Sequence, residues 1–199
     1  MFPLFETIRI VDGAAQQLAY HQIRMEQATE AHYGVPLELN LAQVVDVPKK
    51  FSKGLVKLRL DYGVHACSQA YAHYKARSIK TLRTIKDEDI SYKIKATDRS
   101  HIDRLWSQRG PCDDILIVKD GMVTDSSYTN ILFLKGNDWI TPNTPLLKGT
   151  QRAYLLDAGL ITEASVHLDA IGDYDGFQLV NAMMPFQENY VMNVRGIHY

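Results

Sequence analysis

The sequence lacks the features that mark several classes of protein. Its 199 residues include two cysteines, Cys67 and Cys112, which are too few for a disulfide framework and do not form a CxxC pair. No run approaches the roughly 18 to 20 apolar residues that a membrane-spanning helix needs. Residues 1–6 show neither the charged nor the apolar part of a signal peptide. We therefore expect a cytoplasmic protein with free thiols and no membrane partner.

An excess of positive charge is also missing. The formal net charge is −1, whereas a nucleic-acid binder usually carries a concentrated basic excess. A basic and aromatic group could contact RNA, but such a group is more often a solvated strand edge; its members are Tyr71, Tyr74, Lys75 and Arg77. The seven histidines show no HExxH-like spacing, and no GxSxG, GxGxxG or GxxxxGK[ST] motif is found. We expect neither a nucleic-acid partner nor a metal.

The hydrophobic pattern predicts an α+β protein with mixed sheets and two lobes. In the first lobe we expect strands at 2–11 and 54–62, helices at 14–33 and 39–50, and a strand pair within 66–85. A charged connector at 86–89 suggests a boundary, with a smaller α/β lobe at 1–88 and a larger β-rich lobe at 89–199. The second lobe should contain helices at 98–108 and 148–158, a strand meander at 115–140, and strands at 165–168 and 177–181.

Two residues, Lys95 and Asp125, suit the chemistry of a single cofactor. A lysine amine can form a Schiff base with pyridoxal phosphate, and a buried carboxylate can keep the pyridine nitrogen of that cofactor protonated. Lys93 lies two residues before Lys95 and would share its strand face, so periodicity does not choose between the two lysines. Asp125 lies in a polar run between two apolar strands, which is also typical of an ordinary turn.

A phosphate group could be held at two places. A helix beginning within Gly149-Thr150-Gln151-Arg152 would present free backbone N–H groups and the positive end of its dipole. Arg24, on the first expected helix, could supply a fixed positive charge. Helix starts and helix arginines are common in proteins that bind no phosphate, so neither feature indicates a site alone.

Five stretches of the chain resemble, in order, motifs of the class IV aminotransferases, which are fold-type IV pyridoxal phosphate enzymes. They are Phe5-Glu6-Thr7-Ile8-Arg9 with Asp12-Gly13, His21-Gln22-Ile23-Arg24-Met25, Ile94-Lys95-Ala96-Thr97-Asp98-Arg99, Val123-Thr124-Asp125 through Asn130-Ile131, and Pro145-Leu146-Leu147-Lys148-Gly149-Thr150-Gln151-Arg152. The resemblance covers almost the whole chain. It implies a two-lobed fold like that of the D-amino acid aminotransferases, here with a shortened N-terminal strand region.

The resemblance also implies roles for individual residues. It selects Lys95 as the catalytic, Schiff-base lysine and Asp125 as the partner of the pyridine nitrogen. The residues expected to bind pyridoxal 5'-phosphate are Arg24, Lys95, Asp125, Leu147, Thr150, Gln151 and Ala182. The residues that we expect to contact a small amine or amino-acid substrate are Phe5, Lys57, Arg59 and Tyr62, with Lys57 or Arg59 taking a carboxylate. Family members are usually homodimers, so we expect a homodimer.

Three departures from the family pattern stand out. Asp125 replaces the usual glutamate and is one methylene shorter. The sequence shows no counterpart of the family's leading strand and the glycine-rich loop that follows it. Residues 61–65 lack the S/T-R-G arginine that contacts substrate in some D-amino acid enzymes.

One stretch indicates the reaction. Residues 181–186, Asn-Ala-Met-Met-Pro-Phe, resemble the N-A-L-M-P stretch of 4-amino-4-deoxychorismate lyase. This favours a lyase that forms 4-aminobenzoate and pyruvate for folate synthesis. A transaminase acting on branched-chain or D-amino acids is the alternative, and a non-catalytic protein that binds pyridoxal phosphate or another partner is a further one.

Overall fold

A computed structural model describes residues 2–199, which divide by their contacts into two compact units. Unit 1 contains the chain up to Ala76 together with Ile94–Asp98, and unit 2 contains Arg77–Lys93 and Arg99–Tyr199. Among residues 2–199, none of the helices combines the length and the apolar character that crossing a membrane requires.

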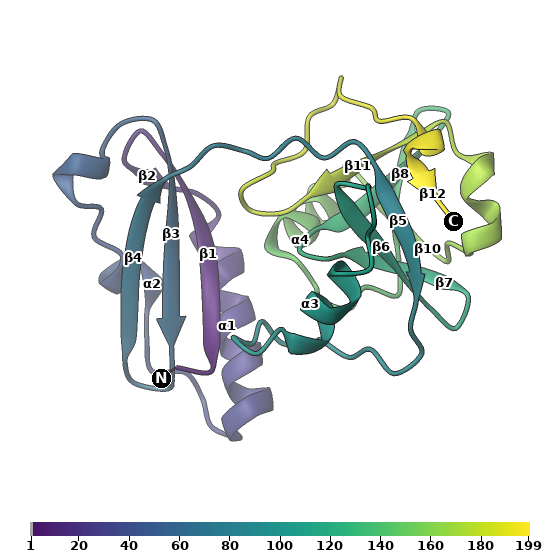
Figure 1. The fold of residues 1–199 in the computed structure, drawn as a ribbon. Helices are drawn as coiled ribbons and strands as arrows, with labels where there is room; N and C mark the ends of the chain where they lie inside the picture. Colours follow the sequence, from purple (N-terminus) through teal and green to yellow (C-terminus); the bar gives the residue numbers. More distant parts are fainter. Residues whose placement is uncertain (1) are drawn as a thin grey trace. The chain divides into compact units, whose positions relative to one another are not determined.

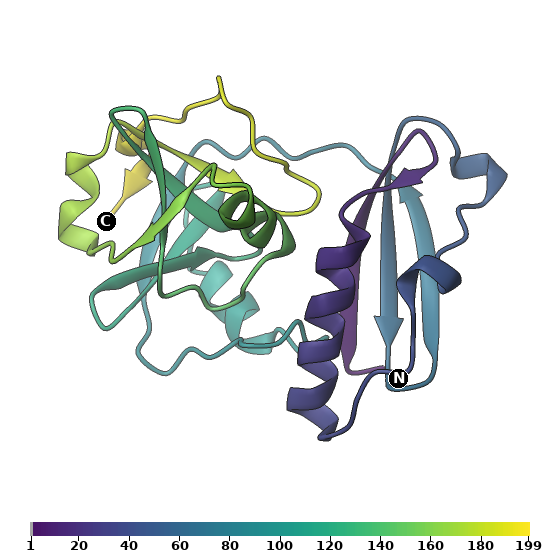
Figure 2. The ribbon, with the colours of Figure 1, turned by 180° about the vertical axis from the view of Figure 1, so that it is seen from behind.

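Unit 1 is built on a four-stranded antiparallel sheet in the order β2-β1-β3-β4. The strands are β1 (Leu4–Val11), β2 (Ala14–Ala15), β3 (Leu55–Tyr62) and β4 (Cys67–His73). Helices α1 (Leu18–Tyr33) and α2 (Leu41–Val44) lie on the same face of this sheet, as the opposite views in Figures 1 and 2 show. A short 3-10 helix, η1 (Lys49–Phe51), precedes β3.

The two faces of this sheet differ because strand side chains alternate. On β3, every second residue is fully buried in the cluster that packs against α1, beginning with Val56 and Leu58 and ending with Tyr62. The residues between them, including Lys57 and Arg59, are only half-buried. Unit 1 therefore has an apolar face under its helices and a polar face that carries charged side chains.

Residues 94–98 join unit 1 because β1 has a free edge. The short strand β2 pairs only with Ile10 and Val11, so the first half of β1 can accept another segment. Ala96 forms a bridge with Leu4, and the Phe5 N–H donates to the Lys95 carbonyl at 3.1 Å. These bonds assign Lys95 to unit 1, although the sequence suggested that it belongs to a lobe beginning at residue 89.

Unit 2 contains an eight-stranded mixed sheet in the order β10-β9-β8-β7-β6-β5-β12, with β11 also paired to β8. Its strands are β5 (Leu82–Lys86), β6 (Asp114–Lys119), β7 (Met122–Ser126), β8 (Asn130–Lys135), β9 (Asp138–Pro142), β10 (Thr162–Ala164), β11 (Gly176–Val180) and β12 (Ile197–His198). Three pairs are parallel: β5 with β6, β12 with β5, and β10 with β9. The expected meander forms β6 to β9.

Two helices of unit 2 pack on this sheet. α3 (Ser100–Trp106) buries Ile102 and Leu105 against Ile115 and Ile117 of β6. α4 (Thr150–Asp157) buries Leu155 in a separate cluster with residues of β8, β9 and β11. Two further 3-10 helices are η2 (Leu168–Asp173) and η3 (Val194–Gly196).

Several elements differ from the sequence-based prediction. The helix expected at 39–50 is broken into α2 and η1, with Pro48 between them. The two strands expected as a pair within 66–85 form as β4 and β5 but belong to different sheets. Because β5 pairs with β6 and β12, residues 77–88 lie in unit 2 rather than in the first lobe.

Two tight turns follow the sequence closely. Asp12 and Gly13, between β1 and β2, have φ values of 48° and 83°, and Asp120 and Gly121, between β6 and β7, have 51° and 74°. Asp-Gly suits such turns because both central residues must adopt positive φ. The β1–β2 and β6–β7 turns were therefore predictable from these dipeptides.

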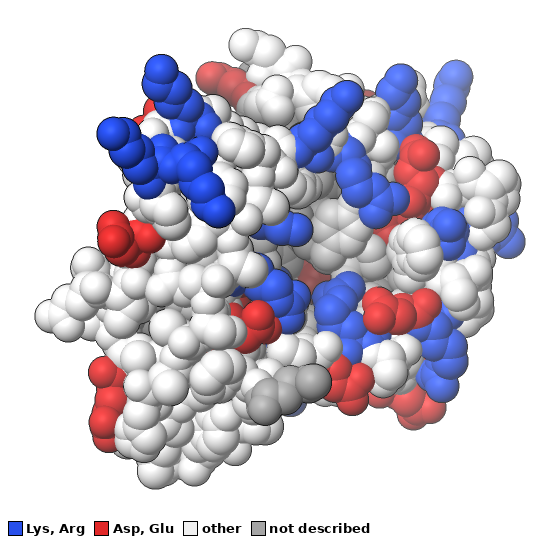
Figure 3. Space-filling model, turned by 60° about the vertical axis from the view of Figure 1, so that its left-hand side comes forward, with Lys and Arg blue, Asp and Glu red and all other residues white. Residues whose placement is uncertain are grey.

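Charge on the surface is mixed. On the face drawn in Figure 3, lysine and arginine side chains form separate groups, and aspartate and glutamate side chains lie beside several of them. This distribution matches the formal net charge of −1.

Candidate active site

The predicted site residues fall in both units, and each group is described by itself. Unit 1 holds Phe5, Arg24, Lys57, Arg59, Tyr62 and Lys95. Unit 2 holds Asp125, Leu147, Thr150, Gln151 and Ala182.

The structure distinguishes Lys95 from its neighbour Lys93. Lys93 is exposed, whereas Lys95 is half-buried in the segment that pairs with β1. The Lys95 amine lies 4.7 Å from the centroid of the Phe5 ring, a distance at which a cation is attracted to an aromatic face. Residues 92–95 form no regular strand, so the alternation expected for them does not apply.

Arg24 is held by a buried acid that the sequence analysis did not single out. Its Nε donates to Glu6 Oε1 at 2.8 Å and its Nη2 donates to Glu6 Oε2 at 2.5 Å. His21, one turn earlier on α1, contacts the same Oε2 through Nδ1 at 2.8 Å. Glu6 and His21 are fully buried, while the Arg24 side chain keeps 12% exposure. The bidentate contact fixes the plane of the guanidinium and leaves Nη1 outside it.

The charges in this group follow from its geometry. Burial alone would raise the pKa of Glu6, but the Arg24 charge and the hydrogen bonds from His21 and Arg24 outweigh it and hold that pKa well below its usual range. Burial lowers the pKa of His21, with the Glu6 contact opposing it and the charges of Arg24 and Lys95 adding to it. Glu6 is therefore ionised and His21 neutral near pH 7. The positive charge of Arg24 is balanced by the negative charge of Glu6.

The predicted substrate residues lie on different faces of the unit 1 sheet. Phe5 and Arg59 contact each other, with the guanidinium carbon 4.1 Å from the ring centroid. Lys57 lies near the Tyr74 ring instead, at 5.8 Å. Tyr62 is fully buried on the apolar face, where burial and, to a lesser extent, the nearby charge of Glu6 raise the pKa of its hydroxyl. Tyr62 is therefore separated by the sheet from the polar face that carries Arg59.

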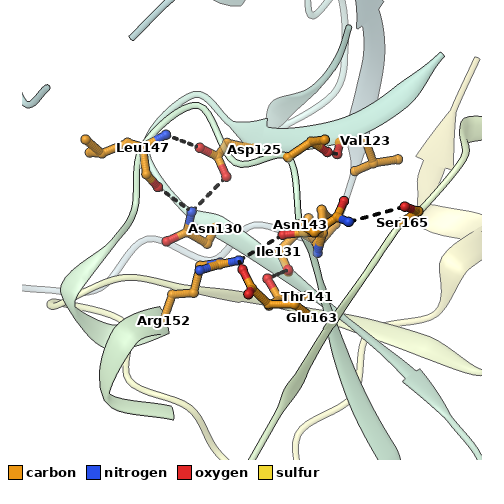
Figure 4. Close-up of polar contacts among 12 residues, drawn as sticks. Val123, Asp125, Asn130, Ile131, Thr141, Asn143, Leu147, Arg152, Glu163 and Ser165 are labelled. Atoms are coloured by element: carbon orange, nitrogen blue, oxygen red, sulfur yellow. Dashed lines mark hydrogen bonds and ion pairs between the residues drawn. The ribbon is translucent and has the colours of Figure 1, made fainter. Parts of the chain in front are cut away.

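In unit 2, Asp125 is a buried carboxylate with two defined donors (Figure 4). The backbone N–H of Leu147 donates to Oδ2 at 2.9 Å, and Asn130 Nδ2 donates to Oδ1 at 2.7 Å. The same Asn130 nitrogen donates to the Leu147 carbonyl at 2.9 Å. Asn130 thus ties the strand that carries Asp125 to the loop that precedes α4.

The pKa of the Asp125 carboxyl lies near neutral pH. Burial raises its pKa, and the bonds from Leu147 and Asn130 and the charge of Arg152 oppose burial only in part, so the pKa is about 7. Arg152 itself is buried and is held by Glu163 and by the Pro142 carbonyl. A cationic group that pairs with such a carboxyl stabilises its ionised form.

The start of α4 is built closely around Gly149. A Cβ at position 149 would lie 2.1 Å from Asn130 Oδ1, so a larger residue would clash with the side chain that holds Asp125. The first backbone bond of the helix runs from the Ala153 N–H to the Gly149 carbonyl. The N–H groups of residues 150–152 therefore precede the intrahelical bonding. Thr150 is buried, and its hydroxyl has no hydrogen-bond partner among the described residues.

The remaining cofactor candidates have simpler surroundings. Leu147 and Ala182 are half-buried, and Gln151 is buried. Ala182 lies in the turn after β11, where Asn181 Oδ1 accepts hydrogen bonds from the backbone N–H groups of Met183 and Met184. Glu6, His21 and Asn130 support the predicted site residues and were not expected to do so from the sequence, although all three lie in the quoted motifs.

Comparison with known proteins gives a consistent result. The sequence profile of a family described as amino-transferase class IV matches residues 3–188. A protein of uncharacterised function from Haemophilus influenzae is 38% identical over 185 residues, covering 92% of this chain and 98% of its own length.

Solved structures extend this comparison. A protein from Haemophilus somnus 129PT, provisionally described as a 4-amino-4-deoxychorismate lyase, is 35% identical with a TM-score of 0.87, covering 94% of this chain and 98% of its own. The PLP-bound form of a hypothetical aminotransferase from Mycobacterium tuberculosis has a TM-score of 0.77 at 18% identity, covering 98% and 81%. The expected two-lobed α+β fold with mixed sheets is therefore confirmed.

Proposed function

Because the chain belongs to the class IV aminotransferase family, whose members are pyridoxal phosphate-dependent lyases and transaminases, we propose that it binds pyridoxal 5'-phosphate and acts as a 4-amino-4-deoxychorismate lyase. The observation that carries the proposal is the buried carboxylate of Asp125, fixed by the Leu147 N–H and by Asn130. A buried acid with a pKa of about 7 is suited to pair with a protonated pyridine nitrogen.

The residues present fit this cofactor. The buried Thr150 hydroxyl and the N–H groups at the start of α4 offer donors for a phosphate, and Gly149 leaves room beside Asn130. Arg24, held in place by Glu6, would add a fixed positive charge for the same group. Leu147 would pack on the ring, and Gln151 and the Ala182 backbone would complete the phosphate contacts.

When bound, the cofactor would supply an electron-withdrawing ring that stabilises negative charge on the carbon beside the substrate amine. Lys95 would hold the cofactor covalently through Nζ and then, once released, remove the proton from that carbon. Asp125 would keep the pyridine nitrogen charged throughout. The Lys95 amine lies 4.7 Å from the centroid of the Phe5 ring, which also belongs to unit 1.

The lyase and transaminase readings differ in where Lys95 returns this proton. In the lyase it would protonate the methylene carbon of the departing pyruvate, leaving the aromatic 4-aminobenzoate. In a transaminase acting on branched-chain or D-amino acids it would return the proton to a different carbon, and a keto acid would leave. The likeness to the Haemophilus somnus protein, 35% identical over nearly the whole chain, favours the lyase.

Two measurements test the proposal. Purified protein mixed with pyridoxal phosphate should show a visible absorbance band that is absent in Lys95→Ala and kept in Lys93→Ala; a band that survives in Lys95→Ala would contradict the assignment. Aminodeoxychorismate should then give sustained release of 4-aminobenzoate without any keto-acid acceptor. If release occurs only when a keto acid is added, the transaminase alternative replaces the lyase.

Location and assembly are also part of the proposal. Cys67 and Cys112 are both free thiols, which supports a reducing compartment such as the cytoplasm. We propose a homodimer acting on a small-molecule amine, by analogy with the family. Light scattering of the purified protein would test the dimer directly.

A further inference from the structure

Phe5 lies between two positively charged side chains in unit 1. The Lys95 amine is 4.7 Å and the Arg59 guanidinium carbon 4.1 Å from the centroid of its ring. Strand β3, which carries Arg59, pairs with one edge of β1, and the segment that carries Lys95 pairs with the other edge. The two cations therefore belong to segments on opposite edges of β1, and both lie against the ring of Phe5.

Arg59 is held in a defined orientation by Asp61. Its Nε donates to both carboxylate oxygens at 3.0 Å, and its Nη2 donates to Oδ1 at 2.7 Å. A guanidinium has five N–H donors, so this contact uses one edge and leaves the outer edge formed by Nη1 and Nη2. The side chain keeps 42% exposure, and across residues 2–199 no other hydrogen bond or ion pair of Arg59 is found. Asp61 thus orients an outer fork toward solvent.

Within the part of the chain that the structure describes, Lys57 has neither the contact with Phe5 nor the orienting carboxylate that Arg59 has. It lies two residues before Arg59 on the same face of β3, opposite Arg9, and its amine is near the Tyr74 ring rather than Phe5. An ammonium group is also a point charge, whereas a guanidinium fork matches the planar geometry of a carboxylate. The structure therefore separates two residues that the sequence left as equal candidates.

We propose that the outer fork of Arg59 binds a substrate carboxylate that is distant from the reacting amine. The inference rests on the proposed function, because it takes Lys95 as the residue that meets the amine. The α-carboxylate of an amino acid lies only about 3 Å from its nitrogen, by ordinary covalent geometry. A carboxylate carried across a six-membered ring lies roughly twice as far away, which suits two cations carried by segments on opposite edges of β1. The favoured substrates are thus cyclic amines with a remote carboxylate.

Binding to the protein without cofactor tests this assignment. 4-Aminobenzoate and 4-aminobenzamide have the same shape but differ in the charge of the group opposite the amine. By isothermal titration calorimetry, Arg59→Gln should weaken 4-aminobenzoate binding by about 10- to 100-fold, as loss of a charge-assisted bidentate contact does. It should leave the binding of 4-aminobenzamide unchanged. Asp61→Asn should give a smaller loss with the same selectivity, because the fork remains but is no longer oriented.

Control variants make the result decisive. Lys53→Gln removes one exposed positive charge from the same unit and should change neither affinity. Arg59→Lys, which keeps the charge but not the fork, should still lose selectivity for the carboxylate. Equal losses for both ligands, no loss at all, or a selective loss in Lys57→Gln instead would overturn the inference. This binding measurement uses protein without cofactor. If the visible absorbance band that depends on Lys95 is not found, the proposed function is contradicted, but the result for Arg59 still stands.

Discussion

Asn130 Nδ2 lies 2.7 Å from Asp125 Oδ1 and 2.9 Å from the Leu147 carbonyl, so one amide group joins the buried acid to the loop before α4. The other atom of the same amide, Oδ1, lies against Gly149. The position of the acid and the start of the helix are therefore coupled through a single side chain. This coupling predicts that changes at residues 130 and 149 act on the same site.

Replacing Asn130 by alanine should release both ends of this link. Asp125 loses a donor and the Leu147 carbonyl loses its side-chain partner, which costs about 1–3 kcal/mol for buried groups. The pKa of Asp125 should rise further, because a bond that favours its ionised form is gone. Chemical unfolding measures the stability, with Asn143→Ala as control, since its bond to Ser165 is exposed. Equal effects of the two variants would contradict the expected role.

Gly149→Ala should destabilise the protein for a steric reason. Gly149 has an ordinary φ of −68°, so backbone strain is not the cause. The added Cβ would instead lie 2.1 Å from Asn130 Oδ1 and force that amide to move, at a cost of about 1–3 kcal/mol. Gly172→Ala is a matched control, because a Cβ there meets nothing within 4 Å. Thermal unfolding should lower the Tm of the first variant and leave the second nearly unchanged.

The sequence predicted much of the fold because buried strand faces impose a period of two. The alternation of Val56, Leu58 and Leu60 with Lys57 and Arg59 identified β3 and its buried face. The same alternation also places Tyr62 on that buried face, a signal available before the structure. What alternation cannot encode is the partner of a strand. Strand β5 was therefore predicted, but its membership of the unit 2 sheet was not.

The site was predicted less completely, because its supporting contacts join distant parts of the chain. Lys93 and Lys95 could not be distinguished by spacing, since the choice depends on a segment that pairs with β1 instead of forming a regular strand. In the sequence, Glu6 has the pattern of an ordinary strand residue. Its role depends on the packing of α1, which places Arg24 and His21 in contact with it.

Burial of Asp125 should make the free energy of unfolding depend on pH. The folded protein keeps this proton up to about pH 7, whereas the unfolded chain loses it near the ordinary carboxyl pKa. Stability should therefore fall as pH rises between these values, by up to roughly 4 kcal/mol. Asp125→Asn cannot ionise, so its Tm relative to wild type should increase from about pH 5 to about pH 8 without cofactor. A difference that stays constant with pH would contradict this expectation.

A control and the cofactor sharpen this test. Asp157→Asn removes an exposed carboxyl of α4 and should show no comparable pH dependence. Adding pyridoxal phosphate should stabilise wild type more than Asp125→Asn, because a positive pyridine nitrogen would offset the buried charge.

The buried pair of Glu6 and Arg24 should contribute stability with the opposite pH dependence. Glu6→Gln leaves the Arg24 guanidinium beside a neutral amide, and breaking a buried pair in this way costs about 3 kcal/mol. Because the pKa of Glu6 is held low by Arg24 and His21, the wild-type advantage should be full above the ordinary carboxyl pKa and shrink as pH falls below it. Urea unfolding at about pH 7 and about pH 3 measures this difference.

The same variant separates stability from cofactor binding. Without Glu6 to fix its plane, Arg24 should bind phosphate less well, so affinity for pyridoxal phosphate should fall by about tenfold while affinity for pyridoxal, which has no phosphate, should hold. Glu38→Gln is the matched control, because Glu38 pairs with His65 at an exposed position and its loss should cost under about 1 kcal/mol. If Glu6→Gln weakens both ligands equally, Glu6 supports the fold of unit 1 and has no specific part in orienting Arg24.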